Sequence, residues 1–183
     1  MSELLLPTFK YHPDPISSGS IVASGVKCKA CNQSRGFMYI GAVYSSHELD
    51  DALCPWCIFD GTAHRLFGAE FIDPKAVGDY GRWDAVPGSV MDEVCFRTPS
   101  FNGWQQERWF THCGDAAEFI APVGSAELQN FDSSLYKAIA EESGFSTDEL
   151  AQYMKSLDRD SGPTAYAFCC RVCGTWGGYS DTH

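Results

Sequence analysis

Hydrophobic positions in the first half of the chain predict one strand and one short helix. Residues 37–44 form an aromatic and β-branched run that is typical of a strand, with a bend at Gly41. Residues 58–71 place apolar side chains three and four positions apart, which predicts a helix. The Pro-, Ser- and Gly-rich residues 7–25 predict an extended lead-in, and residues 73–88 predict a long irregular connection.

The second half is predicted to be mainly helical. Apolar residues recur at helical spacing in four segments, 89–97, 104–120, 125–142 and 146–157. Gly144 follows the third segment at the position where helices favour glycine, and Ser146 with Glu149 forms a capping-box pattern before the fourth. Residues 164–169 then predict a strand near the end of the chain.

Four of the nine cysteines form a metal-binding pattern. Cys28 and Cys31 are separated by two residues, as are Cys54 and Cys57, and 22 residues lie between the pairs. Each pair places two thiolates on one tight turn, and two pairs complete a tetrahedral shell around zinc. A turn pair, an aromatic strand and a pair at a helix start predict a treble-clef zinc finger. Redox chemistry at Cys54-Pro-Trp-Cys57 is the alternative, because such pairs at helix starts have a lowered pKa.

The second constellation is less complete. Cys170 and Cys173 form another close pair, and the candidates to complete a second zinc site are His112, Cys113, Cys95 and Cys169. On the predicted helix over 104–120, the neighbours His112 and Cys113 would project about 100° apart, which disfavours a shared metal. Cys113 is then expected to be a buried, inert thiol. His112 with Asp115 is the alternative arrangement, as a base and the group that orients it; the other histidines show no evident partner.

These elements predict an α+β fold. Residues 1–72 would form the lead-in and a treble-clef-like zinc finger, and residues 73–183 a mainly helical region that ends in a strand and a cysteine knuckle. The two regions are expected to pack as one compact unit. No apolar stretch approaches the roughly 20 residues of a membrane span, and no signal peptide is evident, so we expect a cytoplasmic, reducing location.

The charge of the chain limits its partners. The formal net charge is −11, and the acidic residues are spread along the whole sequence. Direct nucleic-acid binding is disfavoured, because phosphate contacts need clustered Lys and Arg, and an anionic membrane surface is disfavoured for the same reason. A basic protein partner fits the acidic field.

Several motifs resemble the CbrC family of small bacterial proteins, and the resemblance covers nearly the whole chain. The matching segments are Leu6 to Pro15, Cys28-x-x-Cys31, Cys54-Pro-Trp-Cys-Ile-x-Asp-Gly61, Phe101-x-Gly-Trp-Gln-Gln-Glu-x-Trp109, His112-Cys-Gly-Asp115, Cys170-x-x-Cys-Gly174 and Gly178-Tyr-Ser-Asp181. The resemblance implies an association with tolerance of a nuclease colicin, and an immunity role beside polymorphic toxins. It implies no catalytic residues.

The sequence therefore predicts a zinc-stabilised immunity-type protein, without enzymatic activity, that binds and neutralises a bacterial toxin such as a basic nuclease. Trp104 and Gln105 are candidate partner contacts, although packing of the finger against the second half is the favoured role of the tryptophan. Local charge density adds the acidic candidates Glu141, Glu142, Asp148, Glu149, Asp158 and Asp160. The alternatives are a zinc- or thiol-dependent enzyme around His112, Cys113, Cys170 and Cys173, or a regulatory zinc finger.

Overall fold

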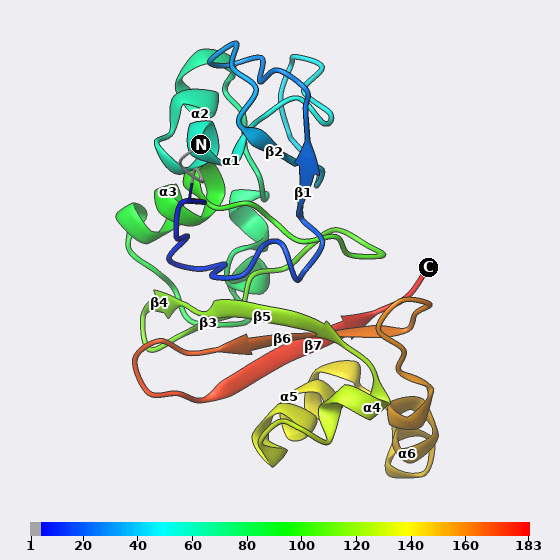
Figure 1. The fold of residues 1–183 in the computed structure, drawn as a ribbon. Helices are drawn as coiled ribbons and strands as arrows, with labels where there is room; N and C mark the ends of the chain where they lie inside the picture. Colours follow the sequence, from blue (N-terminus) through cyan, green and yellow to red (C-terminus); the bar gives the residue numbers. More distant parts are fainter. Residues whose placement is uncertain (1–4) are drawn as a thin grey trace.

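The computed structural model describes residues 5–183 and places a three-stranded sheet at the centre of the molecule (Figure 1). The strands are antiparallel in the order β5-β6-β7: β5 Glu118–Val123, β6 Thr164–Cys169 and β7 Trp176–Asp181. Three helices lie beneath the sheet: α4 Ser125–Leu128, α5 Ser133–Ser143 and α6 Thr147–Ser156. Residues 5–100 lie above it.

The N-terminal part consists of short elements joined by loops. Strands β1 Ile21–Ser24 and β2 Gly36–Tyr39 pair antiparallel. The helices that follow are α1 Pro55–Phe59, α2 Thr62–Phe67 and α3 Gly88–Arg97, with 3-10 turns η1 Pro74–Ala76 and η2 Asp79–Gly81 between the last two. A small hairpin of β3 Thr111–His112 and β4 Asp115–Ala116 leads into the central sheet.

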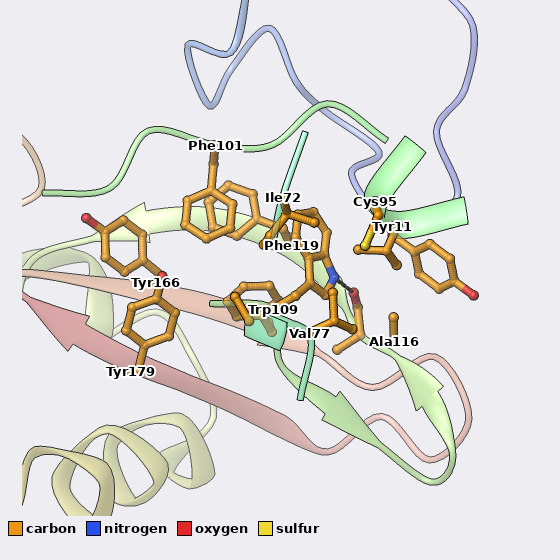
Figure 2. Packing of buried hydrophobic residues seen from close by; sticks show 14 residues of the cluster. Tyr11, Ile72, Val77, Cys95, Phe101, Trp109, Ala116, Phe119, Tyr166 and Tyr179 are labelled. Atoms are coloured by element: carbon orange, nitrogen blue, oxygen red, sulfur yellow. Dashed lines mark hydrogen bonds between the residues drawn. The ribbon is translucent and has the colours of Figure 1, made fainter. Parts of the chain in front are cut away.

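Strand β6 is buried on both faces, which explains its continuous apolar sequence. Tyr166 belongs to the cluster above the sheet, together with Trp109 and Phe119 (Figure 2), and Phe168 is a member of the same cluster. Ala165 and Ala167 belong to the cluster between the sheet and the helices below. Because strand side chains alternate between faces, the large side chains of β6 fill the cluster above the sheet. Its alanines face the other way and allow the helices below to approach the sheet closely.

Gly178 in β7 lies where β6 and helix α5 both come close to the strand. A Cβ at this position would overlap the carbonyl oxygen of Tyr166 in β6 and lie 3.1 Å from Cδ1 of Leu135 in α5. The backbone of the neighbouring strand therefore excludes a side chain here, and a Cβ would also crowd Leu135 of α5.

The predicted α+β class is confirmed, but the prediction of a mainly helical second half is wrong. Residues 104–120 form a loop, the β3–β4 hairpin and the start of β5 instead of one helix. Cys113 and Gly114 both have positive φ, of 57° and 70°, and make the two-residue turn of the hairpin. Two consecutive residues in this conformation end any helix and favour a tight hairpin turn.

Other predicted elements are present with shifted bounds. Helix α3 and helix α6 match their predictions closely, and Gly144 ends α5 with a positive φ of 69°. The helix predicted over 125–142 is divided into α4 and α5, because Asp132 caps α5 by accepting a 2.8 Å hydrogen bond from the Ser134 backbone. Gly61, with φ of 73°, likewise separates α1 from α2, and the strand predicted over 37–44 ends at Tyr39.

The structure also shows how the lead-in contacts the second half. Tyr11 is fully buried in the upper cluster, and its carbonyl accepts a 2.8 Å hydrogen bond from the Phe119 backbone in β5. The division of the chain at residue 72 stays a prediction. Within residues 5–183, no helix combines the length and the apolar character that crossing a membrane requires.

His12 is fully buried and has two partners that the sequence did not reveal. Its Nδ1 lies 2.8 Å from the carbonyl oxygen of Pro99, and its Nε2 lies 2.8 Å from Oγ of Ser18. Burial disfavours the charged ring and lowers the pKa of His12 to about 4.

We expect this histidine to make stability depend on pH. Its folded-state pKa lies below the unfolded value of about 6.5, so its contribution is complete above that pH and is lost as pH falls towards 4. The shift corresponds to about 3 kcal/mol of unfolding free energy. Urea unfolding of the protein and of His12→Gln between pH 7 and pH 4 measures it: the variant should lose less stability on acidification. Equal losses in both would contradict the assignment.

Candidate metal centres

The first cysteine group is assembled from the β1–β2 loop and the start of α1. Cys28 and Cys31 lie in the loop that connects β1 to β2, while Cys54 and Cys57 lie at the start of α1. The backbone of Ala52 accepts a 2.8 Å hydrogen bond from Lys29, and that of Leu53 accepts one of 3.0 Å from Tyr39. These bonds hold the segment before Cys54 against the first pair.

The geometry of this group fits a tetrahedral metal ion. The four sulfur atoms lie within 4.8 Å of one another, and Cys31 Sγ is 3.9 Å from Cys54 Sγ. Zinc–sulfur bonds of about 2.3 Å at tetrahedral angles separate sulfur atoms by about 3.8 Å. The Cys54 backbone N–H also donates to Cys28 Sγ over 3.3 Å, which stabilises negative charge on that sulfur.

The thiols influence one another's protonation. Hydrogen bonds from Cys54, which has the larger effect, and from Cys57 lower the pKa of Cys28 far below its ordinary value. The same contact with Cys28 raises the pKa of Cys54 to about 11, and hydrogen bonds with Cys28 and Cys54 raise the pKa of Cys57 strongly. One thiolate is thus favoured among these three thiols, and a divalent cation would stabilise further thiolates as ligands.

The second group joins two hairpin turns that are far apart in the sequence. His112 and Cys113 lie at the β3–β4 turn, and Cys170 and Cys173 lie at the β6–β7 turn. The second turn is closed by backbone hydrogen bonds of 2.8 Å from Cys170 to the Thr175 carbonyl and 2.9 Å from Gly174 to the Cys170 carbonyl.

Ligand distances in this group also match a tetrahedral site. His112 Nδ1 is 3.2 Å from Cys113 Sγ and 3.3 Å from Cys173 Sγ, and these two sulfurs are 3.7 Å apart. All four potential ligand atoms lie within 4.8 Å of one another. One nitrogen and three sulfurs are a donor set that zinc binds in structural sites.

The expectations for His112 and Cys113 are corrected here. Cys113 is exposed and not an inert core thiol, and the hairpin turn brings its sulfur beside His112. Asp115 does not orient His112: its Oδ1 accepts a 2.6 Å hydrogen bond from the Tyr11 hydroxyl and one of 2.9 Å from the Ala116 backbone. Cys95 and Cys169, the other proposed partners, lie outside both groups.

The two groups differ in exposure. Cys28, Cys54 and Cys57 are buried in the hydrophobic cluster of the N-terminal part, whereas Cys113 and Cys173 are exposed. Hydrogen bonds from Thr175, whose hydroxyl is 3.1 Å from Cys173 Sγ, lower the pKa of Cys173 to about 6. Because Cys113 and Cys173 are exposed, the second group is open to solvent. A metal ion bound there would exchange with solution more readily than one bound by the first group.

The candidate partner contacts are scattered and differ in accessibility. Trp104 is partly exposed, and its indole N–H donates to Thr164 Oγ1 over 2.8 Å. Gln105 is exposed near the end of β7. Glu142 is engaged with Arg108 and Arg82, at 2.6 and 3.2 Å. The remaining acidic candidates are exposed: Glu141, Asp148, Glu149, Asp158 and Asp160.

Comparison with known proteins identifies the family of the chain. A family model described as "Uncharacterised protein family (UPF0167)" matches residues 6–182. The chain belongs to the UPF0167 family. UPF0167 proteins of Mycobacterium bovis and Mycobacterium tuberculosis are each 44% identical to it over 178 residues, covering 96% of this chain and 93% of theirs. A UPF0167 protein of Pseudomonas aeruginosa is 38% identical over 170 residues, covering 92% of this chain and 93% of its own.

The UPF0167 match corrects the assignment to the CbrC family. The matching family model and the similar proteins carry the UPF0167 description, and the motifs that suggested CbrC lie within the matched residues. No solved structure matches the chain. The colicin association was implied only by the CbrC resemblance and loses that support, while a toxin-immunity role stays a prediction.

Removing a ligand of the second group is expected to lower the zinc content from two ions to one per chain. Cys173→Ser replaces an exposed sulfur, so we expect a stability loss of about 1–2 kcal/mol. Elemental analysis and urea unfolding measure the two effects. Cys169→Ser is the matched control, because Cys169 precedes the ligand candidate Cys170 in the sequence but lies outside the group. Unchanged zinc content in Cys173→Ser would contradict the site.

Proposed function

We propose that this UPF0167 protein is a binding protein held together by two structural zinc ions, with a basic protein as its partner. The proposal rests on the observation that each group offers four protein ligands at tetrahedral spacing. A catalytic zinc ion keeps one position open for water or substrate, and a four-ligand group leaves none. The treble-clef description of the first site and a cytoplasmic location belong to the same proposal.

The charge of the chain supports the choice of partner. The formal net charge is −11, and seven zinc-bound thiolates with two divalent ions would make it about −14. Such a field repels nucleic acid and attracts basic proteins. Toxin nucleases are basic proteins of this kind, because their substrates are polyanions. We therefore propose immunity against a nuclease toxin as the biological role.

The alternative function, a zinc- or thiol-dependent enzyme at His112, Cys113, Cys170 and Cys173, would require a different arrangement of ligands. It needs an open coordination position or a free thiolate, whereas this group supplies one nitrogen and three sulfurs to a single point. A regulatory zinc finger would need a basic footprint, and the first group has few basic residues between its cysteines.

Co-expression with a nuclease toxin encoded beside the gene tests the proposal. The protein should restore growth of the toxin-expressing cells and co-purify with the toxin in a salt-sensitive complex. A triple variant of Glu141→Gln, Asp148→Asn and Glu149→Gln should weaken the complex. The control neutralises three exposed acids of the N-terminal part, with Glu48→Gln, Asp50→Asn and Asp51→Asn. No complex and no protection would overturn the proposal.

A further inference from the structure

A cavity of about 410 Å³ lies at the end of β7 and beside Tyr80 of η2, and no residue of either cysteine group lines it. It is bordered by the loop before β3, the end of β7 and the connection between α5 and α6. The loop contains Gln105 and Gln106 of the Trp-Gln-Gln-Glu motif that the sequence singled out. Neither metal group uses these residues.

Aromatic rings form part of the cavity wall. Tyr80 is 60% exposed and Phe145 is 43% exposed, although both are large apolar side chains. Phe145 packs against Tyr153, with 4.4 Å between ring centroids. Exposed rings around a cavity provide faces on which a planar cation can stack.

The cavity also has an excess of negative charge. Asp181 lines it and is 8% exposed, and Glu107, at 6%, lies behind the same loop. Among residues 5–183, no Lys or Arg forms an ion pair with either carboxylate. Burial raises the pKa of Asp181, so a cation bound beside it would favour its ionised form.

The one cation in the wall is already paired. Arg108 bonds Glu142 at 2.6 Å and 3.2 Å and Asp79 at 3.1 Å, and its guanidinium stacks 4.1 Å from the Tyr179 ring centroid. Its charge is balanced by these two carboxylates. Its attraction also lowers the pKa of Asp181, but one guanidinium serves three carboxylates, Asp79, Glu142 and Asp181, so negative charge remains in excess.

Hydrogen-bond acceptors complete the lining. The side-chain amide nitrogen of Gln105 donates to the Thr182 carbonyl at 3.0 Å, and that of Gln106 donates to Asp73 at 3.3 Å. Each nitrogen uses one of its two N–H donors in this contact, and each amide oxygen is an acceptor. A guanidinium carries five N–H donors and a flat face, which suits acceptors beside aromatic rings.

We propose that this cavity receives an arginine side chain of a basic partner protein. The inference rests on the proposed function and specifies where and how that partner is held. A lysine would satisfy the charge, but it lacks the planar group that stacks on the rings. The cavity therefore discriminates between two kinds of basic surface.

Two labelled peptides test the inference with the zinc-loaded full-length protein: an Arg-Gly repeat and a Lys-Gly repeat of equal length and charge. Fluorescence anisotropy should show about fivefold tighter binding of the arginine peptide. The variant Tyr80→Gly should abolish this preference. Its φ of 55° suits glycine, so the variant should fold with an unchanged melting temperature.

Tyr136→Ala is the matched control, because Tyr136 is a 43% exposed tyrosine that does not line this cavity. It should keep the preference for arginine. Equal binding of both peptides, or an arginine preference that survives Tyr80→Gly, would overturn the inference. Either result leaves the proposed function to its own co-expression test, which depends on the toxin and not on these peptides.

Discussion

Replacing Cys57 with alanine is expected to unfold the N-terminal part of the protein. Cys57 is 2% exposed and belongs to the same hydrophobic cluster as Cys28 and Cys54. Structural zinc contributes about 10–16 kcal/mol of apparent binding free energy, which is comparable to the whole stability of a domain. Loss of one of four ligands should therefore cost several kcal/mol and remove one zinc ion.

Circular dichroism during urea unfolding, together with elemental analysis, measures both effects. Cys95→Ala is the control, because Cys95 is a fully buried cysteine that lies outside both metal groups. We expect it to cost about 1 kcal/mol and to leave the zinc content unchanged. If Cys57→Ala kept two zinc ions and the unfolding midpoint of the control, the first site would not be a metal centre.

The ligands of the first group could be predicted from the sequence because the information is local. The two cysteines of each pair are separated by only two residues, and the strand and helix next to them are short. The second group could not be predicted with the same precision. Cys113 and Cys173 meet only because two hairpin turns sixty residues apart lie together, and the first turn was expected to be helical.

The central sheet shows a similar limit. Strand β6 has the apolar run that predicts a buried strand, and it was predicted. Strand β5 contains Pro122, and β7 contains Gly177 and Gly178, all of which have low strand propensity. These two strands form because they pair with β6 on either side, so tertiary contacts override local preference.

Charge density along the sequence did not distinguish free acids from paired ones. Glu141 and Glu142 are neighbours, yet Glu141 is exposed while the Glu142 side chain is 11% exposed. The partner of Glu142 is Arg108, which lies 34 residues earlier. Glu142 is thus placed to hold the loop around Arg108 against α5, and the free acids are the ones available to a partner.

Glu142→Gln is therefore expected to lower stability. Burial opposes the charge of Arg108, but hydrogen bonds and attraction from Glu142, together with Asp79, raise the pKa of Arg108. Without the Glu142 charge, a guanidinium that is 19% exposed loses a two-point contact, at a cost of about 2–4 kcal/mol. The neighbouring change Glu141→Gln should cost less than about 0.5 kcal/mol.

Urea unfolding of the two variants separates these roles, because each removes one negative charge from adjacent positions of α5. A long-range effect of net charge would act equally on both, whereas the contact with Arg108 belongs to Glu142 alone. Equal midpoints for the two variants would show that the ion pair contributes no stability. A lower midpoint for Glu142→Gln assigns Glu142 to the fold, which leaves Glu141 as the acid of this pair that a basic partner can reach.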